Sequence, residues 1–251
     1  MTVGENGRSA LPGPDDVVRH QFDNGIAVLV RENQTSPAVV VGGYLQVGAI
    51  DVPPAQAGLA TFTAAALMRG TRKRSSAQIY DEIEAVGAEV SFGSGVHTTG
   101  FGAKSLAEDL PLVLDVLAEA LQYPTFPDVE IERLRGQILT ALDVRANDTG
   151  AMAGLAFREL AYANGHPYGR SVRGYPDTIR ALSRDDLVRF YQSGYGAQGL
   201  IICIVGAVHA EEIKPQVEAV FGNWRGRTLP RLPLPVVRRP EGIVSKRVDL
   251  P

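Results

Sequence analysis

The chain has 251 residues, of which 45% are hydrophobic and 21% charged, so it has the composition of a globular protein with a substantial core. Its formal net charge of −3 and scattered Lys and Arg residues do not favour a polyanionic partner. The single cysteine, Cys203, excludes an internal disulfide and a cysteine-based zinc site, and its apolar neighbours indicate a small buried hydrophobic residue. No signal peptide or apolar run of membrane-spanning length is found, so we expect a soluble chain.

The first part of the chain is dominated by predicted strands. Residues 1–16 are rich in Gly, Ser and Pro and are expected to form a flexible tail. Asp23-Asn24-Gly25 between two apolar runs predicts a β-hairpin. Gly42-Gly43 within the next strand indicates a bulge or a close approach of another backbone. In chain order we predict strands at 18–22, 26–32 and 38–47, helices at 55–68 and 77–86, and one or two strands within 89–104.

The second part is dominated by predicted helices. Ser183 and Asp186 resemble a capping box, which marks the start of one helix. The predicted elements are helices at 106–122, 129–145, 151–162, 183–191 and 210–221, with a buried strand at 200–206. Strands followed by helices, with one late strand, predict an α+β fold: a largely antiparallel sheet with helices packed on one face. We expect this domain to cover residues 17–226, and the Pro- and Arg-rich residues 227–251 to be a linker.

The stretch from Gly58 to Thr71 reads G-L-A-T-F-T-A-A-A-L-M-R-G-T. It resembles the signature G-x-A-H-F-L-E-H-M-x-F-x-G-T of the pitrilysin and mitochondrial-processing-peptidase family of zinc metallopeptidases. The resemblance extends over residues 17–224 and includes the Asp-Asn-Gly turn and His166-Pro167-Tyr168-Gly169. It implies the N-terminal half of a processing-peptidase-like metallohydrolase, with the linker leading towards an absent second half.

The metal-site positions of this family are replaced in the present chain. In an H-x-x-E-H helix two His bind zinc and the Glu acts as general base. Thr61, Ala64 and Ala65 stand at these three positions. The family's third ligand, a Glu in a later helix, corresponds to Ala141, and the nearest acid, Asp143, lies about 200° around a helix from it. We therefore expect no catalytic residue, no bound metal and no cofactor.

The remaining charged and histidine residues do not predict a replacement site. No two histidines stand three or four residues apart, so no helix presents a ready ligand pair. We favour a helix start over a ligand cluster at His209, a surface or hydrogen-bonded role over a cleft role at His97, and a structural turn at His166. The basic run 69–74 and the strip Glu130, Glu132, Arg133 and Arg135 are interpreted as a solvated turn and a solvated helix face.

The resemblance implies a non-catalytic subunit of a two-chain zinc processing peptidase, which assists peptide binding and chamber closure. The alternatives are a structural core-type subunit without a proteolytic role, and an atypical zinc metalloendopeptidase whose site is misread. The expected partners are a zinc-bearing homologous subunit or further copies of this chain, together with a peptide substrate. Neither nucleic acid nor a membrane span is expected. The family occurs in the bacterial cytoplasm and periplasm, and the sequence selects neither compartment.

Overall fold

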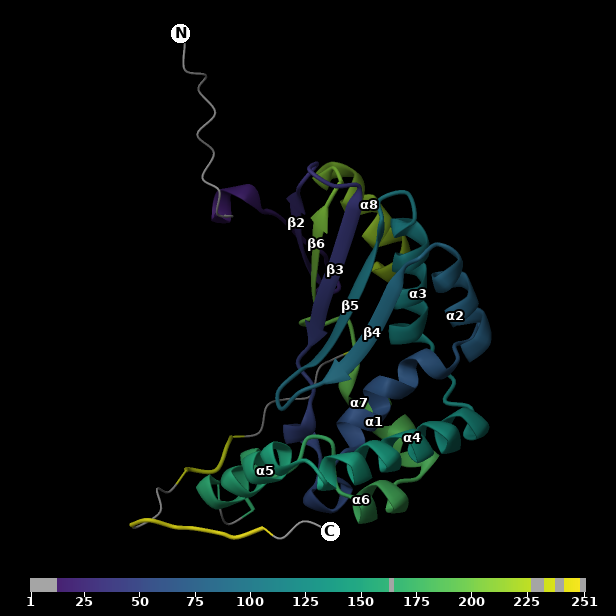
Figure 1. Cartoon of the computed structure of the whole chain (residues 1–251). Coiled ribbons are helices and arrows are strands. Elements are labelled where there is room, and N and C mark those ends of the chain that lie inside the picture. Colours follow the sequence, from purple (N-terminus) through teal and green to yellow (C-terminus); the bar gives the residue numbers. More distant parts are fainter. Residues whose placement is uncertain (1–12, 163–164, 227–232, 238–241, 249–251) are drawn as a thin grey trace.

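The computed structural model describes residues 13–162, 165–226, 233–237 and 242–248. Its centre is a six-stranded sheet in the order β1-β2-β6-β3-β5-β4 (Figure 1). Only β2 and β6 are parallel, and all other neighbouring strands are antiparallel. This arrangement confirms the predicted α+β class. The strands are β1 Val18–Gln21, β2 Ala27–Glu32, β3 Ala38–Leu45, β4 Glu89–Ser94, β5 Thr99–Leu106 and β6 Ile201–Gly206.

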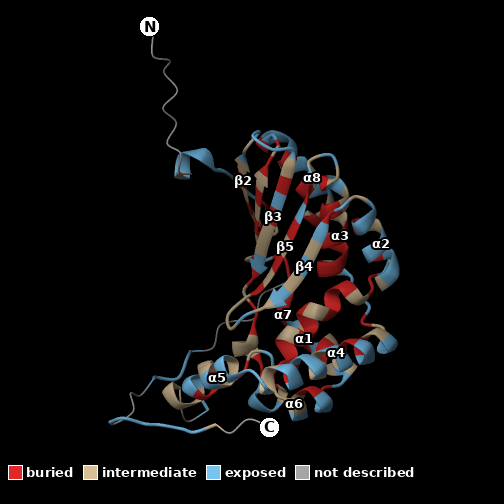
Figure 2. Ribbon diagram, viewed as in Figure 1, coloured by how far each residue is buried: buried red, intermediate tan, exposed pale blue. Residues whose placement is uncertain are grey.

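Helices cover one face of the sheet and gather at one of its ends. Figure 1 shows α2, α3 and α8 beside the sheet, and α4, α5 and α6 together below the strands. Buried residues concentrate between the helices and the sheet (Figure 2). The helices are α1 Leu59–Ala66, α2 Ser76–Ala85, α3 Leu110–Gln122, α4 Asp128–Ala146, α5 Thr149–Ala161, α6 Pro176–Ala181, α7 Arg184–Gly194 and α8 Ala210–Phe221.

Local sequence signals explain several of these elements. The first hairpin forms at the Asp-Asn-Gly turn, where Gly25 has a φ of +92° and Asn24 Nδ2 donates to Phe221 O at 2.8 Å. The predicted capping box is present at Ser183, before α7, and a second one stands at Ser75, before α2. The register of β3 with both its neighbours is continuous, so the glycine pair makes no bulge. A Cβ at Gly43 would clash with the backbone oxygen of Ile201 in β6, which confirms the alternative, a close approach of another backbone.

Three predictions are corrected by the structure. The helix predicted at 55–68 is shorter, because α1 begins after Gly58 and is flanked by the 3₁₀ turns Pro54–Gln56 and Leu67–Arg69. Helix α6 was not predicted, although Pro176 at its first turn is a recognised start signal. The strand at 200–206 is buried on one face only. Cys203 points to the other face and is half-buried rather than buried.

The predicted tail and linker lie partly outside the described residues. The residues outside the description are 1–12, 227–232, 238–241 and 249–251. Within the predicted tail, Pro14–Asp16 form a short 3₁₀ turn. Residues 233–237 and 242–248 contain neither helix nor strand. The linker role of residues 227–251 therefore stays a prediction. Within the described ranges, no helix is long and apolar enough to cross a membrane.

Candidate functional site

Helix α1 is held tightly at its N-terminus. Gly58, which precedes it, has a φ of +98°, a conformation that favours glycine. A Cβ at Gly58 would also lie 2.6 Å from Ile179 Cδ1 of α6. The helix then contacts α4, α7 and β4, and Phe62 is fully buried. The glycine thus allows α1 to start directly against α6 and to pass beneath the edge of the sheet.

The structure brings two of the four predicted metal-site positions together. Thr61 of α1 and Ala141 of α4 line the same recess, which has a volume of about 160 Å³. The Thr61 hydroxyl donates a hydrogen bond to Val172 O at 2.8 Å. Ala64 is 0% exposed, and Ala65 is half-buried against the hydrophobic core. Neither Ala64 nor Ala65 belongs to the recess lining, which is Gly58, Thr61, Phe62, Ile138, Ala141, Leu142, Arg173 and Ile179.

The side chains around this recess do not fit a zinc ion. Zinc requires thiolate, imidazole or carboxylate ligands, and alanine offers no donor atom. The neutral Thr61 hydroxyl is already engaged with the Val172 carbonyl. Asp143 lines a different cavity, together with Arg145 and Lys246. Within the described part of the chain, no group of three or more His, Cys, Asp or Glu residues could hold a metal ion.

The histidines engage in structural contacts. His97 Nε2 lies 2.8 Å from the Tyr168 hydroxyl, so its predicted hydrogen-bonded role is confirmed. His166 is buried: its Nδ1 accepts from Tyr168 N, and its Nε2 lies 3.1 Å from Pro235 O. His209 stands at the N-cap position of α8 without a side-chain cap hydrogen bond, and the first turn of the helix carries Glu211 and Glu212, as predicted. The contacts of His97 and His166 tie loops to the domain.

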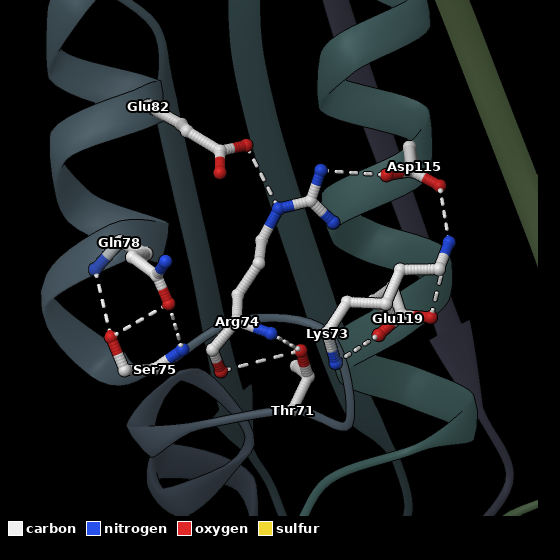
Figure 3. Close-up of polar contacts among 8 residues, drawn as sticks. All are labelled: Thr71, Lys73, Arg74, Ser75, Gln78, Glu82, Asp115 and Glu119. Atoms are coloured by element: carbon white, nitrogen blue, oxygen red, sulfur yellow. Dashed lines mark hydrogen bonds and ion pairs between the residues drawn. The ribbon is translucent and has the colours of Figure 1, made fainter.

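Two cations of the basic run 69–74 pair with neighbouring helices, while Arg72 and Lys73 are exposed as predicted. Figure 3 shows Arg74 between Glu82 of α2 and Asp115 of α3, at 2.8 Å from each. Lys73 reaches Asp115 and the buried Glu119, each at 3.4 Å. The predicted solvated turn is therefore wrong for Arg74, whose side chain is 14% exposed. The interpretation against a recognition patch is supported for Lys73 and Arg74, because both pair with carboxylates of the domain.

The predicted solvated face of α4 also needs a correction. Glu132 and Arg133 are exposed, but Arg135 is half-buried. Arg135 Nη1 donates to Ile179 O of α6, and its guanidinium lies 5.3 Å from the centre of the Phe62 ring. This role of Arg135 was not predicted from the sequence, because its i,i+3 pair with Glu132 is typical of a surface helix.

A second cavity was missed in the sequence. It has a volume of about 490 Å³ and is lined by residues of α4, α5 and the segment 168–173. Four of its described lining residues are arginines, Arg145, Arg158, Arg170 and Arg173, and none is acidic. No single stretch of sequence concentrates these arginines, since three separate segments contribute them. Only the spacing of Arg170 and Arg173 in one loop hinted at a local basic surface.

The α+β architecture, with α1 and α4 meeting at the recess, is the first half of a metallopeptidase fold. Residues 27–172 match the insulinase family, peptidase family M16, and residues 181–250 match the peptidase M16 inactive domain. The chain belongs to peptidase family M16. This membership confirms the predicted resemblance and its N-terminal-half assignment.

Three curated relatives illustrate the range of this family. The chain is 29% identical over 219 residues to an uncharacterized zinc protease of Streptomyces coelicolor, covering 87% of this chain and 45% of the relative. It is 28% identical to bovine cytochrome b-c1 complex subunit 1, and the match covers 86% of this chain and 45% of the relative. It is also 28% identical to the rat mitochondrial-processing peptidase subunit beta, and this match covers 80% of this chain and 41% of the relative. The chain therefore spans less than half the length of these relatives.

Solved structures share the fold. The structure of a peptidase M16 inactive domain from Pseudomonas fluorescens aligns with a TM-score of 0.80 at 23% identity. The alignment covers 88% of this chain and 54% of that one. At this identity the likeness supports the architecture, while the chemistry has to be argued from the residues at the site.

Proposed function

We propose that this chain is a non-catalytic subunit of a two-chain zinc processing peptidase, in which it assists peptide binding and chamber closure. The observation that carries the proposal is the recess between α1 and α4. Thr61 and Ala141 meet there at positions where the family signature has metal ligands, and the lining offers no ligand set for zinc. A chain with this fold and these side chains keeps the framework of a peptidase half without its general base.

Peptide binding does not require the lost residues. Strand β4 stands at one end of the sheet order, and α1 packs against it. An extended peptide can add to such an edge strand through backbone hydrogen bonds, without a metal ion. The free edge of β4 is therefore the proposed binding site for the peptide, beside the recess between α1 and α4. The partner subunit would supply the zinc and the water that it activates.

The test mixes this chain with a zinc-bearing homologue and an unfolded peptide substrate. We expect cleavage to exceed that of the zinc-bearing subunit alone, and the chain alone to be inactive and to contain far less than one zinc per molecule. A peptide with N-methylated backbone amides is the matched control, because it keeps the side chains but loses donors for strand addition. Unchanged cleavage in the mixture would contradict the proposal.

Two alternatives are each favoured by a relative. Similarity to a cytochrome b-c1 complex subunit favours a structural core-type role. In that case the chain would assemble with a homologue without raising its peptidase activity. Similarity to a zinc protease favours an atypical metalloendopeptidase. That function predicts stoichiometric zinc and chelator-sensitive cleavage by the chain alone, so the same purified samples separate all three functions.

A further inference from the structure

The arginine-lined cavity described above lies beside the recess of the altered metal site. Its walls come from α4, α5 and the segment 168–173, and Tyr168 and Ser171 add hydroxyl groups to the lining. Figure 1 shows α4 and α5 next to each other at the end of the molecule. Arg173 lines both the cavity and the apolar recess, so the two spaces are neighbours. The arginine-lined cavity has a volume of about 490 Å³, which is in the range of small-ligand pockets.

Neutral groups hold two of the arginines in place. Arg145 Nη1 donates to Ser171 Oγ at 2.8 Å, and its Nη2 donates to Gly174 O at 3.2 Å. Arg170 Nη1 donates to Val52 O at 2.8 Å. These bonds orient the guanidinium groups at the wall, and none of these acceptors in the described residues carries a negative charge. A planar donor fork fixed in this way is ready to bind a carboxylate with two parallel hydrogen bonds.

The charge of the cavity is not balanced within the described residues. None of its four arginines forms an ion pair with a described acidic residue. The nearby Glu159 is bound instead by Lys246 Nζ, at 3.1 Å, and by the Tyr175 hydroxyl. The Nε atoms of Arg145 and Arg170 are buried and have no acceptor in the described structure. The described acceptors of these two guanidinium groups are therefore neutral oxygens, which leaves the anion preference of the cavity to its open side.

The electrostatics of Arg145 agree with this geometry. Burial lowers the pKa of its guanidinium, and the neighbouring Arg173 and Arg158 lower it further, while Tyr175 opposes the shift. Burial also lowers the pKa of Arg170. Arginine nevertheless stays charged at neutral pH. Several like charges around one cavity repel each other, and a bound anion relieves that repulsion.

We propose that this cavity binds a carboxylate group of a peptide, with the neighbouring recess accepting an adjacent apolar side chain. The peptide nature of the ligand rests on the proposed function, whereas the anion preference rests on the four arginines. Arg173 connects the two parts, because it lines both spaces. The carboxylate has two sources in a peptide, a free C-terminus and an acidic side chain, and the test separates them.

Binding is measured with the chain alone by fluorescence anisotropy of labelled peptides. One peptide is neutral with a free C-terminus, the second is its C-terminal amide, and the third is the amide with one internal Glu. We expect the amidated neutral peptide to bind at least about tenfold more weakly than one of the other two, and we expect salt to weaken the tighter binding. Whichever of the other two binds tightly identifies the source of the carboxylate. Equal affinity of all three would overturn the proposal.

Variants locate the site without disturbing the fold. Arg158→Gln and Arg173→Gln change exposed side chains of the cavity, and each should weaken the tighter peptide about tenfold. Arg133→Gln changes an exposed arginine of α4 outside the cavity and should leave the affinity unchanged. Unchanged affinity in the first two variants, or tight binding of inorganic phosphate with no peptide preference, would overturn the proposal. Failure to stimulate a zinc-bearing homologue would contradict the proposed function alone.

Discussion

The four residues that are predicted to replace a metal site have different surroundings. Ala64 is 0% exposed, whereas Ala141 lies exposed on α4 at the mouth of the recess. Thr61 lies between these extremes, with its hydroxyl bound to Val172 O. The packing around α1 therefore matches the small side chains that are present. A carboxylate at Ala64 would now enter a closed interior without a cationic partner.

The first prediction compares two glutamate substitutions. Ala64→Glu should lower the free energy of unfolding by about 3 kcal/mol or more, because it buries an unpaired charge and overfills a packed position. Ala141→Glu should change it by no more than about 0.5 kcal/mol, since the side chain reaches solvent. Urea denaturation of both variants measures the difference. Equal losses would show that Ala64 is not enclosed by the core as described.

Single residues show what the sequence alone can predict. The sequence places Thr61, Ala64, Ala65 and Ala141 within two predicted helices, and the structure confirms those helices as α1 and α4. Their assignment as replaced metal-site positions stays a prediction. Their burial is not legible, since it depends on Val172 and on α6, which approach α1 from more than a hundred residues away. The same reason hid the arginine cavity. Residue type is local information, whereas the environment of a residue is tertiary information.

At the scale of elements, ion pairs link the turn before α2 to helix α3. Arg74 Nε and Nη2 bind Glu82 and Asp115, and Lys73 N donates to Glu119 Oε2 at 3.3 Å. Glu119 is only 3% exposed and also pairs with Lys73 Nζ at 3.4 Å. The network holds the turn before α2 against α2 and α3.

The second prediction concerns this network. Arg74→Met should lower the free energy of unfolding by about 2 kcal/mol, because it leaves the Asp115 carboxylate without its best donor. Lys73→Met should cost only about 0.5 kcal/mol, since Lys73 is 56% exposed and its pairs are screened by solvent. Thermal unfolding at low and high salt checks both values. A larger loss for Lys73→Met would contradict the assignment of Arg74 as the main contact.

The third prediction concerns pH and helix α7. Burial raises the pKa of Tyr191, whose hydroxyl donates to Leu121 O at 2.9 Å. Burial also raises the pKa of Tyr195, next to α7, while a hydrogen bond to Thr99 opposes the shift. Below the ordinary tyrosine value of 10.0 both the folded and the unfolded chain keep these protons, so stability is unaffected. Above it the unfolded chain ionises first, and stability falls as pH rises.

The measurement is the free energy of unfolding from neutral pH to pH values above that ordinary value. The double variant Tyr191→Phe and Tyr195→Phe should lose about 2 kcal/mol at neutral pH from the two missing hydrogen bonds. It should also show a shallower decline at alkaline pH than the parent chain, because it has fewer protons to lose in the unfolded state. Parallel pH profiles for the two proteins would contradict the burial of these hydroxyls.

Elements with local signals were predictable from sequence, and those set by tertiary contacts were not. The capping boxes at Ser75 and Ser183 are encoded within four residues, and the helices predicted from 77 and 183 begin one residue away, at Ser76 and Arg184. The start of α1 depends on the contact between Gly58 and Ile179, so the predicted helix was too long. Arg135 appeared to be solvated for the same reason, because its acceptor, Ile179 O, lies on another helix.

At the scale of the whole molecule, the sheet has two unlike faces. One is covered by helices, and the other carries half-exposed or exposed apolar residues of the central strands, Val40, Tyr44, Ile201, Cys203 and Val205. The order that places β6 between β2 and β3 could not be predicted, since β6 pairs with strands far away in sequence. Under the proposed function this open face is the wall of the peptide chamber, and a partner subunit closes over it.

Cys203 provides a probe of that closure, which is the fourth prediction. It is the single cysteine of the chain and lies half-buried on the open face. Burial raises the pKa of its thiol, so less of the reactive thiolate forms, and alkylation should be slower in the folded chain than in urea. Adding a zinc-bearing homologue should slow labelling further, because the enclosed face excludes the reagent, whereas an unrelated protein should have no effect. An unchanged labelling rate in a complex that co-elutes on gel filtration would place the partner on another surface and contradict the chamber arrangement.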